Sequence, residues 1–170
     1  MTIKQDDVRR ITALAASRNG GISMGFTEAV RTVLKQKYAT FSGRASRSEY
    51  WWFMLFYGLA LLALIIPAFV LAFAFSGGGA VSPIHYTVVI WLLFILAIFL
   101  PLISLQVRRF HDRNISGWWY LALFIGCYVP YVGLLAGVAI FVVSVLPGTE
   151  GPNKFGADPL RPEIRSEVFA

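Results

Sequence analysis

Two long stretches of this chain carry no Asp, Glu, Lys or Arg side chain. The first runs for 58 residues, over 50–107, and the second for 35 residues, over 115–149. A soluble domain of this size needs charge on its surface and a polar face on its helices. The sequence therefore predicts an all-α integral membrane protein.

The charges that remain lie mostly at the ends of the apolar blocks, and they sum to +6. In a soluble protein such a balance would suggest nucleic-acid binding, but no folded soluble domain is left to carry that function. We predict no nucleic-acid partner and expect the basic residues to meet anionic lipid headgroups. The two histidines and the single cysteine, Cys127, lack the spacing of metal ligands, so no metal site or cofactor is predicted.

The chain divides into a polar tail at 1–22, an amphipathic helix at 23–40, a membrane domain at 41–159 and a C-terminal tail at 160–170. Residues on one face of the predicted amphipathic helix are apolar, and basic residues flank them. This pattern favours a helix lying in the headgroup layer, and the alternative is a short cytoplasmic helix packed on protein. The apolar face consists of Phe26, Ala29, Val30, Val33, Leu34 and Tyr38.

Two apolar segments are predicted to cross the membrane, at 51–75 and 86–107. As helices they reach about 37 Å and about 33 Å, enough for a hydrocarbon core of about 30 Å. A third block at 118–146 would be about 43 Å long as one helix, and Pro130 and Gly133 interrupt its middle. It is either one tilted, kinked span or a re-entrant pair of short helices.

The distribution of basic residues predicts the orientation. Nine Lys or Arg residues precede the first span, none lie in the loop at 76–85, and three lie in the segment after the second span. The positive-inside rule therefore places the N-terminus and residues 108–117 in the cytoplasm. A single third span would put the C-terminal tail outside. A re-entrant pair would return the tail to the cytoplasm, which the basic residues after the block favour.

Three polar motifs flank the apolar blocks. They are FSGRASRSEYWW at 41–52, RRFHD at 108–112 followed by SGWW at 116–119, and PGTEGPNKFG at 147–156 followed by Asp158 and Pro159. With these motifs in this order beside these spans, the chain resembles the bacterial inner-membrane family called domain of unknown function 805. The resemblance covers roughly residues 26–159. It implies a multi-pass protein of the bacterial inner (cytoplasmic) membrane, and it implies no particular activity.

Ionisable residues from the first two motifs are predicted to meet at the cytoplasmic interface. One hypothesis is anchoring, in which the arginines pair with nearby carboxylates or reach lipid headgroups. Another is a binding site for an anionic headgroup or small anion. The third is an interfacial enzyme in which His111 and Asp112 transfer a proton. The predicted cluster consists of Arg44, Arg47, Glu49, Arg108, Arg109, His111 and Asp112.

The sequence favours a non-enzymatic membrane protein with a structural, lipid-binding or accessory role. A small oligomeric transporter or channel is the alternative, although no acidic or basic residue lies at mid-membrane, where one usually marks an ion pathway. Gly133 and Gly137 have the small-residue spacing that lets membrane helices approach closely. They predict helix packing, either within the chain or against a second copy or another membrane protein.

Overall fold

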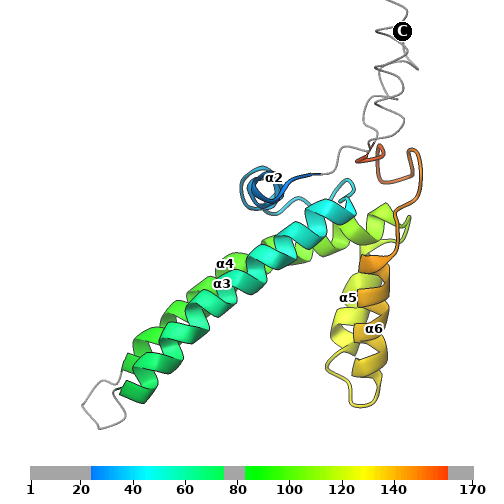
Figure 1. The fold of residues 1–170 in the computed structure, drawn as a ribbon. Helices are drawn as coiled ribbons and strands as arrows, with labels where there is room; N and C mark the ends of the chain where they lie inside the picture. The colour runs from blue at the N-terminus through cyan, green and yellow to red at the C-terminus, as the bar shows by residue number, and fades with distance from the viewer. Residues whose placement is uncertain (1–23, 75–82, 161–170) are drawn as a thin grey trace, which may run out of the picture.

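Two pairs of helices make up the membrane domain, and the pairs meet at one end. The computed structural model describes residues 24–74 and 83–160. The long pair consists of α3 (Arg47–Ala74) and α4 (Pro83–Asp112), and the short pair consists of α5 (Gly117–Gly126) and α6 (Val132–Val145). The two pairs diverge from their shared end like the legs of an inverted V (Figure 1). The predicted tail at 1–22, most of the first loop and residues 161–170 lie outside the described residues.

The helices α3 and α4 have the length and composition of membrane spans. Within their most apolar windows only 6% of the residues of α3 and 22% of those of α4 are buried inside the protein. The core helix of a soluble protein would be mostly buried, so these helices offer their side chains to lipid. The prediction of an all-helical protein with two long apolar helices is confirmed.

The helix α3 begins before the predicted residue 51, and α4 extends beyond both ends of the predicted 86–107. Hydrogen bonds at the start of α3 and at the end of α4 explain the difference. Ser46 precedes α3, and its hydroxyl accepts a hydrogen bond from the backbone N–H of Glu49 at 3.1 Å. After α4 the chain turns at Asn114, which has a φ of 60°. The N–H of Ile115 then donates to the carbonyl of Phe110 at 3.0 Å, as in a Schellman motif.

The third apolar block forms a pair of short helices. A single kinked helix is not what the structure contains, because α5 ends at Gly126 and α6 begins at Val132. Pro130 lies in the turn between them, and Tyr131 there has a φ of 66° and is 98% exposed. The two helices run side by side and return the chain to the end of α4 (Figure 1).

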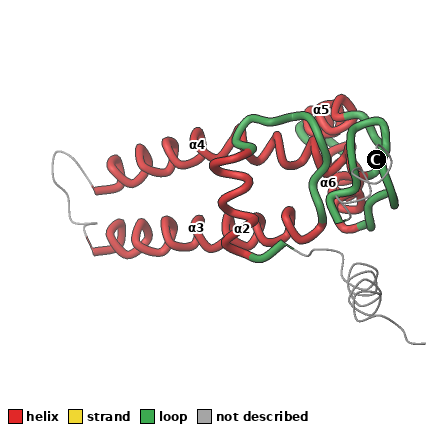
Figure 2. The backbone as a smooth tube through the Cα atoms, turned by 90° about the horizontal axis from the view of Figure 1, so that it is seen from above, coloured by secondary structure: helices red, strands yellow, loops and turns green. Residues whose placement is uncertain are grey.

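The amphipathic segment lies across the long pair. It consists of α2 (Phe26–Arg31), which continues as one turn of π-helix, η1 (Thr32–Gln36). Seen from above, this segment crosses α3 and reaches toward α4 (Figure 2). Ala29 and Val33 are fully buried, and Val33 packs in a core with Phe53 of α3 and Leu105 of α4. Part of the predicted apolar face is therefore packed on protein, and Tyr38 at its end is 37% exposed.

A proline in α4 explains one further contact of this segment. Pro101 has no N–H, so the carbonyl of Ala97, four residues earlier, has no donor within its own helix. The hydroxyl of Tyr38 donates to this carbonyl at 2.5 Å. Tyr38, two residues after the end of η1, thus fastens the segment to α4 by supplying the missing donor.

Candidate functional site

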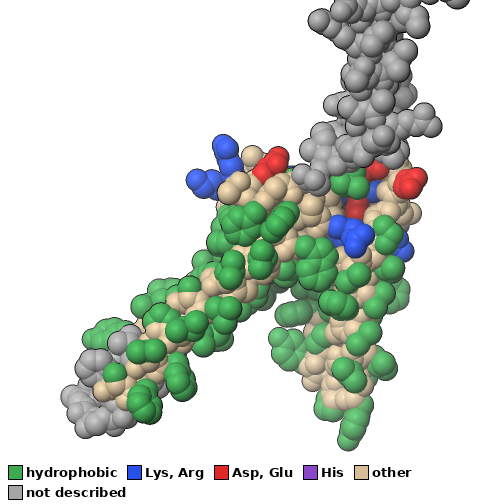
Figure 3. Space-filling view, viewed as in Figure 1, with side chains coloured by type: hydrophobic (Ala, Val, Ile, Leu, Met, Phe, Trp, Pro, Cys, Tyr) green, Lys and Arg blue, Asp and Glu red, His purple; other side chains and the backbone are tan. Residues whose placement is uncertain are grey.

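Charged side chains gather at the end where the two helix pairs meet. The space-filling view shows Lys, Arg, Asp and Glu there, and hydrophobic side chains along both legs (Figure 3). Three segments distant in sequence converge at this end: the residues before α3, the last turn of α4 and the segment after α6. These are the three polar motifs of the sequence.

Asp112 is the centre of the first group of contacts. Its carboxylate accepts a hydrogen bond from Nε of Arg44 at 2.8 Å and pairs with Nη1 of Arg109 through its other oxygen. All three side chains are almost completely buried. Two guanidinium groups share one carboxylate, so the trio retains one positive charge. A buried pair of this kind is stable only where further hydrogen bonds satisfy the remaining groups.

Backbone carbonyls supply those bonds to Arg109. Its guanidinium donates to the carbonyls of Ser144 at 3.1 Å, of Ala45 at 3.4 Å and of Leu146. Gln106, one turn earlier in α4, donates to the hydroxyl of Ser144 at 2.8 Å. The last residues of α6 are thereby fixed to the last turns of α4, which holds the short helix pair in place.

Arg44 fixes the segment that follows α6. Its Nη1 donates to the carbonyl of Gly151 at 2.6 Å, and its Nη2 donates to that of Thr149 at 2.5 Å. Thr149 in turn donates its own N–H to the carbonyl of Asp112 at 2.8 Å. The segment therefore lies over the end of α4 and is bonded to it at several points.

Glu49 and Arg108 form a second buried pair, with 2.5 Å between the carboxylate Oε1 and Nη1. The side chain of Arg108 is completely buried. Among the described residues its Nε and Nη2 have no hydrogen-bond partner, and Glu49 is the one carboxylate there that pairs with this guanidinium. Asp112, four residues after Arg108, pairs with Arg109 and Arg44 instead.

His111 makes contacts that are separate from those of Asp112. Its ring stacks on Phe155, with ring centroids 3.9 Å apart and an interplanar angle of 4°. Its Nδ1 lies 3.2 Å from the carbonyl of Gly43. Adjacent residues on a helix point in different directions, and the described contacts of His111 and Asp112 accordingly share no side chain.

Arg47 is the one member of the predicted cluster that is exposed, and it forms no ion pair with the described residues. The site also includes residues outside the predicted cluster, four of them in the third polar motif. Gly148 is one of them: a Cβ at this position would overlap the carboxylate of Asp112, so only glycine leaves room for that group. The additional residues are Gln106, Ser144, Gly148, Thr149, Asn153 and Phe155.

The family profile described as protein of unknown function (DUF805) matches residues 38–157. This chain belongs to that family. Inner membrane protein YhaI of Escherichia coli (strain K12) is 38% identical over 128 residues, which cover 75% of this chain and 92% of that protein. Inner membrane protein YhaH of the same strain is 36% identical over 127 residues, with the same coverage. No solved structure matches the chain.

The part of the chain that matches the family includes the whole predicted cluster and both helix pairs. The segment α2–η1 precedes it. The relatives are named as inner membrane proteins, which supports a bacterial inner-membrane location for this chain.

The two glycines predicted to mediate helix packing have different surroundings. A Cβ on Gly133 would lie 2.5 Å from the carbonyl oxygen of Cys127, so this glycine permits the tight turn between α5 and α6. Among the described residues nothing lies within 4 Å of a Cβ on Gly137. Gly126 of α5 faces α6, and an added Cβ there would lie 3.5 Å from the Cβ of Ala136, an ordinary packing distance.

Proposed function

We propose that this family member is a non-enzymatic module of the bacterial inner membrane. In this proposal two spans and a re-entrant helical hairpin are locked together by buried ion pairs, and exposed basic residues bind anionic lipid at the cytoplasmic face. The observation that carries it is the way the buried charges are used. Arg44, Arg108, Arg109, Glu49 and Asp112 are all paired with one another inside the protein. Such groups hold elements together and leave little for a reacting substrate.

The dimensions of the short pair support a re-entrant hairpin. The helices α5 and α6 have 10 and 14 residues, and they reach about 15 Å and about 21 Å, which is too short for a hydrocarbon core of about 30 Å. The turn between them satisfies much of its own backbone, since Val129 donates to Gly126 and Gly133 donates to Val129, both at 3.0 Å. A chain that reverses direction within the membrane requires such internal hydrogen bonds for its backbone N–H and C=O groups.

The contacts of His111 and Asp112 argue against an enzyme that uses them as a pair. Two arginines hold the Asp112 carboxylate and orient it toward themselves, away from the ring of His111. A catalytic dyad needs its two groups within hydrogen-bonding reach, and His111 instead lies between Phe155 and the Gly43 carbonyl.

The topology in this proposal predicts that the C-terminal tail is cytoplasmic. In a Cys127→Ala background we expect Ser166→Cys to resist an impermeant thiol reagent in intact spheroplasts and to react after the membrane is opened. Ser82→Cys, in the loop that the sequence predicts to face the periplasm, should react in intact spheroplasts and serves as the control. Labelling of Ser166→Cys as well as Ser82→Cys in intact spheroplasts would contradict the re-entrant hairpin and favour a third span.

The lipid contact predicts a role for the exposed basic residues of α2–η1, Arg31 and Lys35. Anionic lipid should raise the melting temperature of the purified protein, and Arg31→Gln with Lys35→Gln should remove most of that gain, because each basic group near such a surface contributes about 1 kcal/mol. Glu28→Gln, on the same segment, is the matched control and should retain or increase the gain. An unchanged gain in the double variant would contradict lipid binding by this segment.

A further inference from the structure

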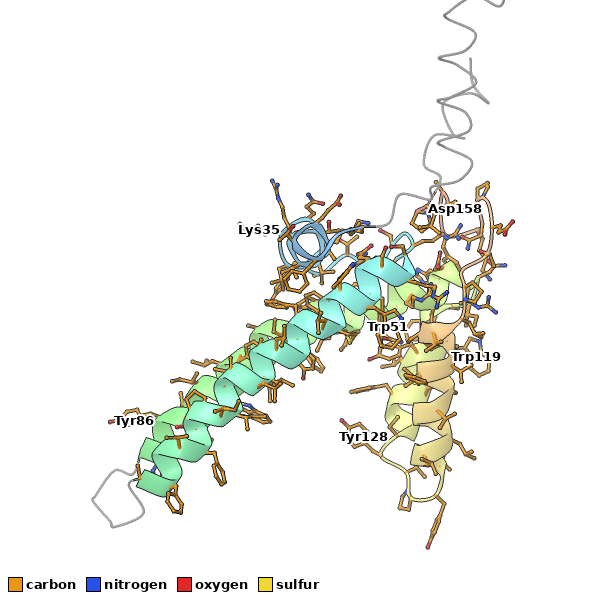
Figure 4. All side chains as sticks on the ribbon, in the orientation of Figure 1. Lys35, Trp51, Tyr86, Trp119, Tyr128 and Asp158 are labelled. Atoms are coloured by element: carbon orange, nitrogen blue, oxygen red, sulfur yellow. The ribbon has the colours of Figure 1, made fainter. Side chains whose placement is uncertain are left out.

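A cavity of about 210 Å³ lies between the start of α3 and the segment after α6. Its volume suits a small polar group, since pockets for drug-sized ligands measure about 300–1,000 Å³. The residues that matter for its chemistry are Arg44, Ser46, Arg47, Asp112, Glu150 and Asp158. Arg47 and Glu150 are exposed at its rim, and the other four are buried in its walls. Asp158 is labelled at this end of the molecule in Figure 4.

One side of the cavity is positive. Arg44 and Asp112 line the cavity, and Arg109 behind them shares the Asp112 carboxylate, so this trio keeps one positive charge. Arg47 adds a second, and among the described residues it forms no ion pair. Ser46 and Arg47 also stand at the N-terminal end of a 28-residue helix, where the helix dipole favours an anion.

The other side is negative. The Asp158 carboxylate is buried, and its two oxygens accept hydrogen bonds from the backbone N–H groups of Gly151 at 3.1 Å and Leu160 at 2.9 Å. No Lys or Arg of the described residues forms an ion pair with it. Each carboxylate oxygen can accept a further bond, so Asp158 retains acceptor capacity. Glu150 adds a second carboxylate at the rim.

We propose that this cavity binds a small zwitterion that carries a phosphate and a primary ammonium, as a phosphoethanolamine group does. A simple phosphate would face two carboxylates, and a simple amine would face two arginines, whereas a ligand with both charges satisfies both walls. A primary ammonium can also donate hydrogen bonds to Asp158 and Glu150, which a quaternary ammonium cannot. The group comes either from a phospholipid headgroup or from a free phosphoethanolamine. The lipid source rests on the proposed function, because it needs this end of the molecule at headgroup level.

The test measures binding of phosphoethanolamine to the full-length protein in detergent by calorimetry, with phosphocholine and inorganic phosphate as matched ligands. We expect phosphoethanolamine to bind more tightly than either. Arg47→Gln should weaken it by about five- to tenfold, since a hydrogen bond between charged groups at an exposed rim contributes less than a buried one. Glu150→Gln should reduce the preference over phosphocholine. Lys37→Gln, which removes a basic residue outside the cavity, is the control and should bind normally.

A second arm separates the two sources. The protein is taken from nanodiscs of mixed phosphatidylethanolamine, phosphatidylcholine and phosphatidylglycerol, and its retained lipid is identified by native mass spectrometry. Retention of phosphatidylethanolamine that Arg47→Gln and Glu150→Gln both lower would support the headgroup as the source, even where the free molecule binds weakly. Equal binding of phosphate and phosphoethanolamine, equal losses in Lys37→Gln, or no binding in either arm would overturn the proposal. The free-ligand arm does not depend on topology or on anionic lipid, so its outcome is distinguishable from failure of the proposed function.

Discussion

Replacing Arg109 by alanine is expected to lower the free energy of unfolding by about 3–5 kcal/mol, the range for removing one partner of a buried ion pair. The change would deprive Asp112 of one of its two cations. It would also leave the carbonyls of Ala45, Ser144 and Leu146 without their donor. Because the bonds to the carbonyls of Ser144 and Leu146 hold the end of α6, the short helix pair should separate from α4. Denaturant unfolding in mild detergent, followed by circular dichroism, measures the loss.

Arg31→Ala provides the matched control for this prediction. It removes the same side-chain type from an exposed position on α2, and such surface changes stay within about 0.5 kcal/mol. A double-mutant cycle with Asp112→Ala should give a coupling energy of about 0.5–3 kcal/mol, as expected for residues in direct contact. A loss in Arg109→Ala no greater than that of Arg31→Ala would show that the buried network does not hold the fold together.

The charge-free stretches were sufficient to predict α3 and α4, because a membrane leaves a strong mark on composition. They did not predict where the helices end. The span predicted to begin at residue 51 begins at Arg47, since Ser46 caps the helix in the polar motif that precedes the membrane. Apolarity shows which residues contact lipid, whereas the extent of a helix depends on its backbone hydrogen bonds.

The sequence left two structures open for the third block, and a long-range contact distinguishes them. Pro130 and Gly133 mark a break but do not say whether the chain continues or returns. What brings α6 back to α4 is the bonding of Arg109 to the carbonyls of Ser144 and Leu146. Those acceptors are backbone carbonyls in an apolar segment. Every residue has such a carbonyl, so the sequence does not show which ones accept these bonds.

The charges next to the spans predicted which residues form the candidate cluster. They did not predict which of these residues pair with each other. Glu49 and Arg108 are 59 residues apart in sequence, and their pairing depends on how α3 and α4 pack. Single polar residues inside the apolar blocks were the signal that went unused. Gln106 and Ser144 are such residues, and they bond to each other at 2.8 Å. A buried polar side chain in an apolar helix needs a partner, so each one predicts a contact.

The pair of Glu49 and Arg108 gives the other large expected effect. Glu49→Ala should lower the free energy of unfolding by about 3–5 kcal/mol, because it leaves a fully buried guanidinium with no carboxylate. Among the described residues two nitrogen atoms of Arg108 already lack a partner, and the loss of Glu49 would leave its Nη1 without one as well. The measurement is again detergent unfolding, with Glu28→Ala on the exposed side of α2 as the control.

The double variant Glu49→Leu with Arg108→Met separates a structural role from a functional one. If the pair serves only to hold α3 against α4, two apolar side chains of similar volume should restore stability to that of the native protein or raise it by about 1–4 kcal/mol. Lipid-dependent stabilisation should then also remain, since the exposed residues Arg31 and Lys35 are unchanged. A double variant that folds stably but loses its response to anionic lipid would contradict the structural reading. It would place the buried pair, together with its two unpartnered nitrogen atoms, in the lipid-binding function itself.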